Sequence, residues 1–139
     1  MRPLRKEQEV GTFDGAWVLV IEDDRDQAEL CADVCADAGL NAMTVGTGLQ
    51  GYWKARYLQP AVIILDLVLP DSDGWEICRR LKTDNRTNGI PIVILTARDE
   101  PNGASLATAA GCAAYVKKPC PPPDLVKVVR KVLREQEAV

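Results

Sequence analysis

Acidic, hydroxyl and amino side chains follow four separate apolar runs of this sequence, and such a set could hold a divalent cation and accept a phosphoryl group. In chain order these polar groups are Glu22-Asp23-Asp24, Asp66, Thr96 and Lys117-Lys118. A few carboxylates together with water are typical of a Mg²⁺ site. An aspartate beside that ion could be the nucleophile that forms an acyl phosphate. A hydroxyl and an ammonium could then bind the oxygens of the transferred group.

The positions of these groups depend on a regular alternation of strands and helices. Short apolar runs predict strands at residues 16–21, 41–45, 61–65, 90–95 and 112–116. Helical spacing of apolar residues predicts helices at residues 25–38, 47–58, 73–82, 101–110 and from the proline run at 121 onward. Gly48 and Gly51 weaken the second of these helices. The alternation indicates an α/β protein whose parallel sheet is covered by helices on both faces.

Ligands of an open parallel sheet bind outside the carboxyl ends of its strands. We therefore expect the four polar groups to meet at one edge of the sheet. Each group also has a simpler explanation: the acids at 22–24 could cap a helix, Asp66 could cap a turn, and Lys118 could be a solvated lysine. Their order and spacing favour one shared site.

Length and composition are those of a single globular domain. The chain has 139 residues and a formal net charge of −3, unlike the strongly basic surface of a nucleic-acid-binding protein. It contains no histidine, which excludes serine–histidine catalytic triads and histidine metal sites. No apolar stretch is long enough to cross a bilayer, and no signal peptide is recognisable. We expect a flexible N-terminal leader at residues 1–15, a domain at 16–139 and a cytoplasmic location.

The sequence contains five cysteines, an odd number, and none of them forms a CxxC pair. They are Cys31, Cys35, Cys78, Cys112 and Cys120. This pattern favours reduced thiols that pack as small apolar groups over a disulfide framework or a zinc site.

Four stretches of the sequence resemble the receiver domain of bacterial two-component response regulators. They are VLVIEDD at 18–24, IILDLVLPDSDGW at 63–75, PIVILTA at 91–97 and AYVKKP at 114–119. They follow one another in the order and at the spacings of that family, over a region from about residue 16 to residue 132. The resemblance implies a flavodoxin-like (βα)5 fold, doubly wound around a five-stranded parallel sheet.

The resemblance also implies a role for each polar group. Asp66 would be the phosphoacceptor, and Lys118 the conserved lysine before the proline. Lys118 fits this role better than Lys117 because neighbouring residues of a strand face opposite sides. The expected Mg²⁺ ligands are Glu22, Asp23, Asp66 and the backbone carbonyl of Val68, and the expected switch residues are Thr96 and Tyr115.

Two positions, Val68 and Arg98, correspond to residues that tune the lifetime of the phosphoryl group in this family. An apolar Val68 cannot orient an attacking water by hydrogen bonding, so we expect slow spontaneous hydrolysis. Glu22 replaces the commoner aspartate, and Cys120 stands where an aromatic residue is frequent. We expect Cys120 to be a buried thiol.

The implied partners follow from the same resemblance. A histidine kinase or a histidine phosphotransfer protein would donate the phosphoryl group, docking on the first helix and the loop that contains Cys120. A downstream protein target or output domain would read the face of the fourth helix, fifth strand and fifth helix, which could also form a homodimer. Because the sequence ends soon after the last helix, without a helix-turn-helix, we expect no direct nucleic-acid binding. We do not expect the protein to bind a membrane. We also do not expect it to be an enzyme, apart from assisting its own phosphorylation and dephosphorylation.

Two alternatives remain open from the sequence. A haloacid-dehalogenase-like phosphohydrolase also uses an aspartate and Mg²⁺ at a strand end, but it usually needs a second aspartate where Val68 stands. A pseudo-receiver would bind partners without being phosphorylated, and the complete set of polar groups argues against it.

Overall fold

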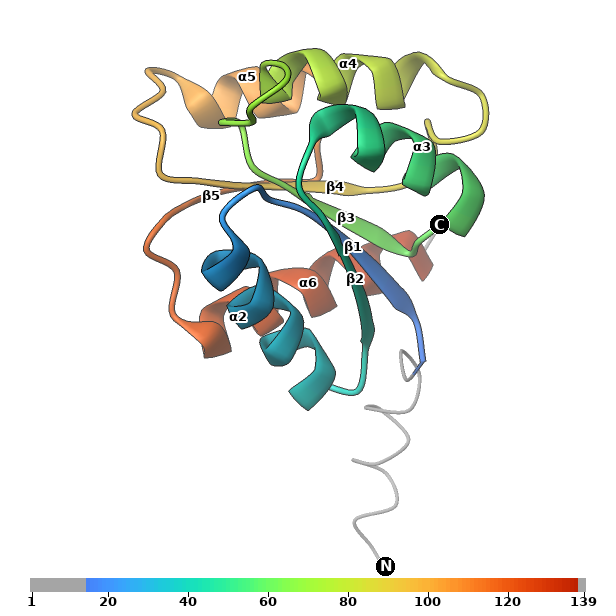
Figure 1. Cartoon of the computed structure of the whole chain (residues 1–139), viewed down its shortest axis with the longest axis vertical. Coiled ribbons are helices and arrows are strands. Elements are labelled where there is room, and N and C mark those ends of the chain that lie inside the picture. The colour runs from blue at the N-terminus through green and yellow to red at the C-terminus, as the bar shows by residue number, and fades with distance from the viewer. Residues whose placement is uncertain (1–14, 138–139) are drawn as a thin grey trace, which may run out of the picture.

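The computed structural model describes residues 15–137, which form a parallel sheet between two layers of helices (Figure 1). The strands are β1 (Trp17–Ile21), β2 (Asn41–Val45), β3 (Val62–Leu65), β4 (Ile92–Thr96) and β5 (Ala114–Lys117). The helices are α2 (Arg25–Asp37), α3 (Gly48–Leu58), α4 (Gly74–Thr83), α5 (Gly103–Ala109) and α6 (Pro122–Glu137). All neighbouring strands are parallel, in the order β2-β1-β3-β4-β5. This is the flavodoxin-like doubly wound order, so the predicted fold is confirmed.

The sheet separates two apolar cores. Helices α2 and α6 cover one face, and α3, α4 and α5 cover the other (Figure 1). Successive strand residues alternate between the two cores: Val18, Val20, Val62 and Ile64 face one, whereas Leu19, Ile21, Ile63 and Leu65 face the other. This burial on both sides explains why the strand sequences are apolar at nearly every position.

The predicted element boundaries agree with the structure to within about two residues, and the differences have a local cause. Thr47 and Asp73, which we predicted as the first residues of helices, are N-caps. Their side chains accept hydrogen bonds from the backbone amides of Gln50 (3.1 Å) and Trp75 (2.8 Å). Both residues therefore stabilise the following helix from just outside it.

The two glycines of α3 have a packing role that the sequence analysis missed. A Cβ atom on Gly48 would lie 2.6 Å from a side-chain carbon of Ile77, and one on Gly51 would overlap the side chain of Ile21. The helix can therefore approach the sheet and α4 closely because these positions have no side chain. The start of α3 is further stabilised by Asp71, whose carboxylate accepts hydrogen bonds from the amides of Gly48 (2.8 Å) and Leu49 (3.0 Å).

The expected leader at residues 1–15 lies outside the described residues, except for Gly15. The amide of Gly15 donates to the carbonyl of Gly39 (3.0 Å), and its carbonyl accepts from the side chain of Asn41 (2.9 Å). Among residues 15–137, no helix has the length and apolarity that a bilayer crossing requires.

All five cysteines are free thiols, as predicted. Three of them, Cys31, Cys35 and Cys78, are buried in the two cores. Cys112 and Cys120 are only partly buried, so the expectation of a buried Cys120 is wrong. Cys120 lies in the connection between β5 and α6 and packs against the adjoining core with part of its surface exposed.

Candidate functional site

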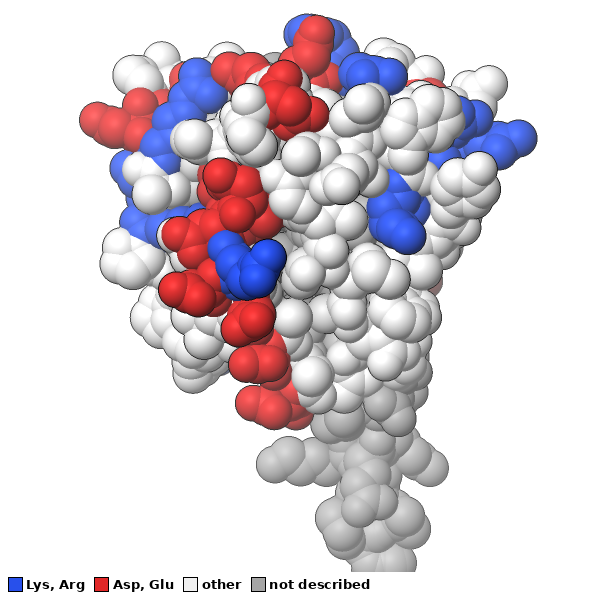
Figure 2. All heavy atoms as spheres, in the orientation of Figure 1, with Lys and Arg blue, Asp and Glu red and all other residues white. Residues whose placement is uncertain are grey.

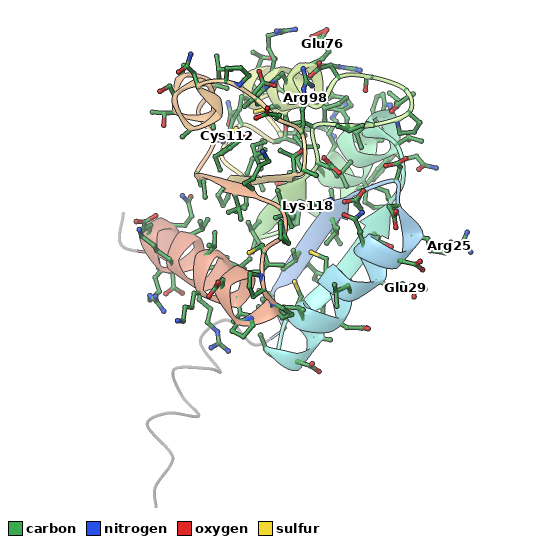
Figure 3. The ribbon with its side chains drawn as sticks, turned by 90° about the vertical axis from the view of Figure 1, so that its left-hand side faces the viewer. Arg25, Glu29, Glu76, Arg98, Cys112 and Lys118 are labelled. Carbon is green, nitrogen blue, oxygen red and sulfur yellow. The ribbon has the colours of Figure 1, made fainter. Side chains whose placement is uncertain are left out.

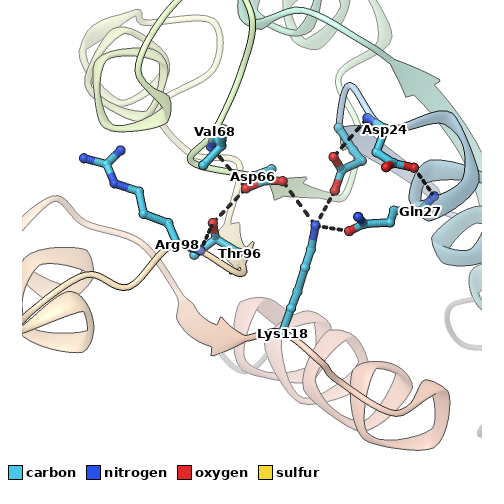
Figure 4. A network of polar contacts seen from close by, with 8 residues as sticks. Asp24, Gln27, Asp66, Val68, Thr96, Arg98 and Lys118 are labelled. Atoms are coloured by element: carbon cyan, nitrogen blue, oxygen red, sulfur yellow. Dashed lines mark hydrogen bonds and ion pairs between the residues drawn. The ribbon is translucent and has the colours of Figure 1, made fainter.

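The carboxyl ends of β1, β3, β4 and β5 bring the polar groups together at one edge of the sheet (Figure 4). Glu22 directly follows β1, Asp66 directly follows β3, Thr96 is the last residue of β4, and Lys118 directly follows β5. The register of the parallel strands sets their mutual positions, since Ile21 pairs with Leu65 and Thr96 with Lys117. The expectation of convergence is met for these four residues.

Lys118 is the centre of the network. Its Nζ atom lies 2.5 Å from Oε1 of Glu22 and 3.1 Å from Oδ2 of Asp66, and it also donates to the side-chain oxygen of Gln27. Both carboxylates are buried, with 8% and 7% of the residue surface exposed. One ammonium group therefore holds two buried carboxylates together.

The other oxygen of Asp66 has two different partners. Oδ1 accepts hydrogen bonds from the hydroxyl of Thr96 (2.8 Å) and the backbone amide of Val68 (3.1 Å). The Thr96 hydroxyl in turn accepts from the backbone amide of Arg98 (3.1 Å). Thr96 is fully buried, so its hydroxyl has a fixed direction toward Asp66.

Burial and charge act in opposite directions on the three ionisable groups. Burial alone would raise the pKa of Asp66, but the Val68 amide, the Thr96 hydroxyl and Lys118 outweigh it and hold that pKa below its ordinary value. Burial raises the pKa of Glu22 above its ordinary value, despite hydrogen bonds from Lys118 and the Asp24 amide. Burial would lower the pKa of Lys118, but Glu22 and Asp66 raise it. Asp66 is thus held ionised, whereas the hydrogen bonds and the Lys118 charge at Glu22 do not offset its burial and the nearby negative charge of Asp66.

The other two acids of the 22–24 run have different surroundings. Asp24 is the N-cap of α2, with its side chain 3.1 Å from the Gln27 amide, so the simpler explanation of the acidic run holds for this residue. Asp23 is exposed, and its carboxylate makes no hydrogen bond or ion pair with any described residue. Within residues 15–137, no three acidic, cysteine or histidine side chains are grouped as a metal site.

Tyr115 and Lys117 lie farther from Asp66. Tyr115 is partly buried against the core beneath α3 and α4, and its ring fills the space above Gly103 on α5. Lys117 forms an exposed ion pair with Asp99 over 3.7 Å. The structure therefore has Lys118, and not Lys117, in the polar network.

Arg98 joins the two loops beside Asp66. Its guanidinium lies 3.0 Å from Oδ2 of Asp73 and 3.1 Å from Oε1 of Glu100. The indole of Trp75 donates to the same Glu100 oxygen over 3.2 Å. The sequence analysis missed this cluster and the contact of Gln27 with Lys118, since residues that meet only in the folded chain leave no local pattern.

A pocket of about 450 Å³ opens beside the network, between α2, α6 and the connection from β5 to α6. Asp66 and Lys118 lie on its wall together with the exposed Leu30. The adjacent surface of α2 is acidic, because this helix carries the exposed Asp26, Glu29, Asp33 and Asp37. Figure 2 shows a column of acidic side chains on this side of the molecule. The phosphoacceptor candidate thus adjoins an apolar hollow with a negative border.

Comparison with known proteins finds curated relatives whose names describe DNA-binding regulators. The DNA-binding response regulator MtrA of Mycolicibacterium smegmatis is 38% identical over 120 residues, which are 86% of this chain and 51% of the relative. The DNA-binding dual master transcriptional regulator RpaA of Synechocystis is 33% identical over 122 residues, 88% of this chain and 51% of the relative. The chain therefore spans about half the length of the curated relatives it matches.

The names of these relatives overturn our prediction about nucleic-acid binding. We expected no direct nucleic-acid binding, because the described domain is mildly acidic and the sequence ends after the last helix. The relatives are DNA-binding proteins of about twice the matched length, so neither the charge of a receiver nor the end of this sequence excludes nucleic-acid binding.

Structural and family comparisons agree. The chemotaxis response regulator CheY4 of Vibrio cholerae superposes with a TM-score of 0.78 at 26% identity, covering 85% of this chain and 98% of that one. The family model of the response regulator receiver domain matches residues 18–130. This assignment favours a signalling domain over the phosphohydrolase alternative. The chain belongs to the response regulator receiver domains of two-component signal transduction.

Proposed function

We propose that Asp66 is the phosphoacceptor of this receiver and that Lys118 and Thr96 assist its phosphorylation. One observation carries the proposal: Lys118 and Thr96 bind opposite oxygens of the same buried, ionised carboxylate. Two donors placed in this way can also bind two oxygens of a phosphoryl group that is attached to Asp66. Phosphoryl transfer needs mainly such positioning and charge neutralisation.

Mg²⁺ is the expected ion, since receiver domains generally depend on it. The donor set of the site fits a hard cation, because Glu22 and Asp66 offer carboxylate oxygens. A cation at this place would also favour the ionised form of Glu22, whose pKa is raised by burial. We propose Glu22, Asp23, Asp66 and the carbonyl of Val68 as its ligands. The ion would offset the negative charge that gathers between Asp66 and the phosphoryl donor.

In the proposed reaction a carboxylate oxygen of Asp66 attacks phosphorus, and the bond from phosphorus to the donor breaks. The donor is a phosphohistidine of a histidine kinase or a histidine phosphotransfer protein, or a small acyl phosphate. The Lys118 ammonium releases Asp66 and binds an oxygen of the phosphoryl group, while the Thr96 hydroxyl turns to another. We assign Tyr115 to the change that follows, because its ring lies next to α5.

The proposed partners use two different surfaces. The donor docks at the pocket between α2 and the β5–α6 connection, where Leu30 gives an apolar contact and the acids of α2 select a basic partner. The face of α5, β5 and α6 transmits the signal to an output domain or a separate target, and can pair two copies of the chain. Following the relatives, we propose that this output includes DNA binding. A cytoplasmic location is part of the same proposal, because histidine donors draw their phosphoryl groups from ATP.

Treatment with acetyl phosphate tests the proposal directly. The purified chain is incubated with acetyl phosphate and Mg²⁺, and its intact mass is measured at once. We expect a gain of one phosphoryl group in the wild-type chain. We expect no gain when a chelator removes Mg²⁺ before acetyl phosphate is added, and no gain in Asp66→Asn. The exposed Asp99→Asn is the matched control and should gain the group normally.

Two results would contradict the proposal. An unmodified wild-type chain would support the pseudo-receiver alternative. Phosphorylation that persists in Asp66→Asn would move the acceptor to another residue.

A further inference from the structure

Two cysteines that the proposed function does not use are in direct contact. The sulfur atoms of Cys78 and Cys112 lie 2.9 Å apart, although the residues are separated by 34 positions. Cys78 lies on α4 and is fully buried. Cys112 lies between α5 and β5, where Figure 3 labels it, and it is partly exposed. The pair thus joins a fully buried residue to one that is partly exposed.

The other cysteines are less suited to forming a disulfide, although Cys31 and Cys35 also share a hydrogen bond, because both of these are buried. Cys31 and Cys35 are four residues apart on α2, and such helical neighbours keep their Cβ atoms about 5–6 Å apart, beyond the 3.5–4.5 Å that is usual in a disulfide. Among the described residues, the hydrogen-bond partner of the Cys120 sulfur is the carbonyl of Pro121, at 3.8 Å, and not another thiol.

We propose that Cys78 and Cys112 are a modification site: they form an intramolecular disulfide when the protein meets a small-molecule disulfide such as oxidised glutathione. The partly exposed Cys112 passes its thiol proton to the neighbouring Cys78 sulfur and attacks one sulfur of the oxidised glutathione, which releases the first glutathione as a thiolate. The sulfur of Cys78 then attacks the Cys112 sulfur and releases the second. Two protein thiols are oxidised, the glutathione disulfide is reduced, and the two thiol protons pass to the released glutathione thiolates.

The surroundings of the pair favour exchange. Hydrogen bonding to Cys112 holds the pKa of Cys78 below its ordinary value against the effect of burial, and the nearby Lys82 ammonium acts in the same direction. The same hydrogen bond and burial raise the pKa of Cys112, so the Cys78 thiolate is the base that takes the Cys112 proton across the 2.9 Å contact and generates the attacking thiolate. The sulfurs are already in contact, so closing the bond requires only a small further approach.

The disulfide would connect α4 to the start of β5 and enclose β4 and α5 in a covalent loop. A cross-link of this length restricts the unfolded chain, so it should raise the Tm by about 5 °C or more. The loop also contains Thr96, and Tyr115 follows Cys112 by three positions. The bond would therefore restrain the elements that border the proposed output face.

The test uses the full chain, reduced and then incubated with oxidised glutathione. Wild type should yield a peptide that joins Cys78 to Cys112 in a non-reducing digest, and its Tm should rise and return to the starting value with dithiothreitol. Cys112→Ser should yield no linked peptide and no rise. Cys120→Ser, which removes the other partly exposed thiol, should behave as wild type. Each variant is first checked for a cooperative thermal transition.

Several outcomes would overturn the inference. They are a wild-type chain that only carries glutathione adducts, a link that forms between other cysteines, and a link that forms in denaturant but not in the folded protein. Because none of these readouts involves Asp66, failure here would leave the proposed phosphorylation untouched. Loss of phosphorylation would likewise leave this inference untouched.

Discussion

The hydroxyl of Thr96 donates a 2.8 Å hydrogen bond to Oδ1 of Asp66, across 30 positions of sequence. The two residues stand at the ends of neighbouring strands, β4 and β3. The contact is buried, so its geometry is set by the sheet and not by a mobile loop. This hydrogen bond joins the proposed acceptor to the proposed switch before any phosphoryl group arrives.

Removing that hydroxyl should destabilise the unphosphorylated protein. Thr96→Ala leaves Oδ1 of a buried carboxylate with one donor fewer, and we expect the free energy of unfolding to fall by about 1.5–3 kcal/mol. Thr96→Ser retains the hydroxyl and should lose distinctly less. Urea unfolding of both variants at pH 7 measures the difference. Equal losses in the two variants would show that the methyl group, and not the hydrogen bond, matters.

Lys118→Met should make stability depend on pH in a new way. Without the ammonium, the pKa of Glu22 in the folded state should rise further above its unfolded value, and the pKa of Asp66 should rise above its unfolded value as well. Folding then takes up protons, so stability falls as the pH increases through the raised pKa values. We expect a loss of about 3 kcal/mol at pH 7 and a smaller loss near pH 4.

Chemical denaturation at the two pH values measures this effect. Lys117→Met, whose lysine is half exposed and forms only a surface ion pair, is the control and should change stability by about 0.5 kcal/mol or less. A loss in Lys118→Met that is the same at both pH values would rule out the electrostatic explanation. Added MgCl₂ should restore part of the stability at pH 7.

Val68→Asn should shorten the life of the phosphorylated state. The side chain of Val68 is 56% exposed and apolar, so it cannot orient a water for attack on phosphorus. The side-chain amide of an asparagine at this position could orient the water. One hydrogen bond that stabilises the transition state by about 1 kcal/mol corresponds to a roughly fivefold faster hydrolysis. The decay of phospho-Asp66 after removal of acetyl phosphate gives the rate. Val68→Ala should resemble wild type, and an unchanged or slower decay in Val68→Asn would count against this role.

Gly103→Ala should move the ring of Tyr115. A Cβ atom at Gly103 would overlap the phenol carbons of Tyr115, and the end of a side chain yields more easily than the backbone of α5. We expect a change in the near-ultraviolet circular dichroism or in the NMR signals of the Tyr115 ring, without unfolding. Gly89→Ala, which meets no atom within 4 Å, is the matched control. An unperturbed ring would mean that α5 shifts instead.

Asp71→Asn tests the link between the β3–α4 loop and α3. The amides of Gly48 and Leu49 lower the pKa of Asp71 in the folded state, so its contribution to stability is present above the unfolded value of 3.8 and is lost as the pH falls through the lower folded value. We expect Asp71→Asn to lose about 1 kcal/mol at pH 7 and less near pH 3. Thermal unfolding across this range measures it. A loss that grows on acidification would contradict the assignment.

Much of the fold and part of the site could be predicted, because both depend on apolar patterns along the chain and on the geometry of a parallel sheet. Apolar runs at residues 16–21 and 61–65 predict strands that are buried on two faces, and parallel strands bring Asp66 and Lys118 to one edge. The burial of each carboxylate could not be predicted, and Glu22 and Asp23 show the result. They are adjacent in sequence, but one is buried against Lys118 and the other is exposed.

The remaining features depend on contacts between loops that are distant in the chain. Asp71 caps a helix that begins 23 positions earlier, and Gln27 reaches a lysine 91 positions away. No periodicity or capping pattern records such pairs, because their approach depends on how the layers pack. The role of Gly51 was missed for the same reason, since only the folded structure brings Ile21 against it.

The indole of Trp75 spans the two loops that flank Asp66 through its bond to Glu100, and this gives the protein an intrinsic optical probe. The other tryptophans, Trp17 and Trp53, lie on β1 and α3, outside the Arg98 cluster. Replacing both with phenylalanine would leave one emitter beside the phosphoacceptor. Loop movement in that protein could be followed in real time by fluorescence, without any attached dye.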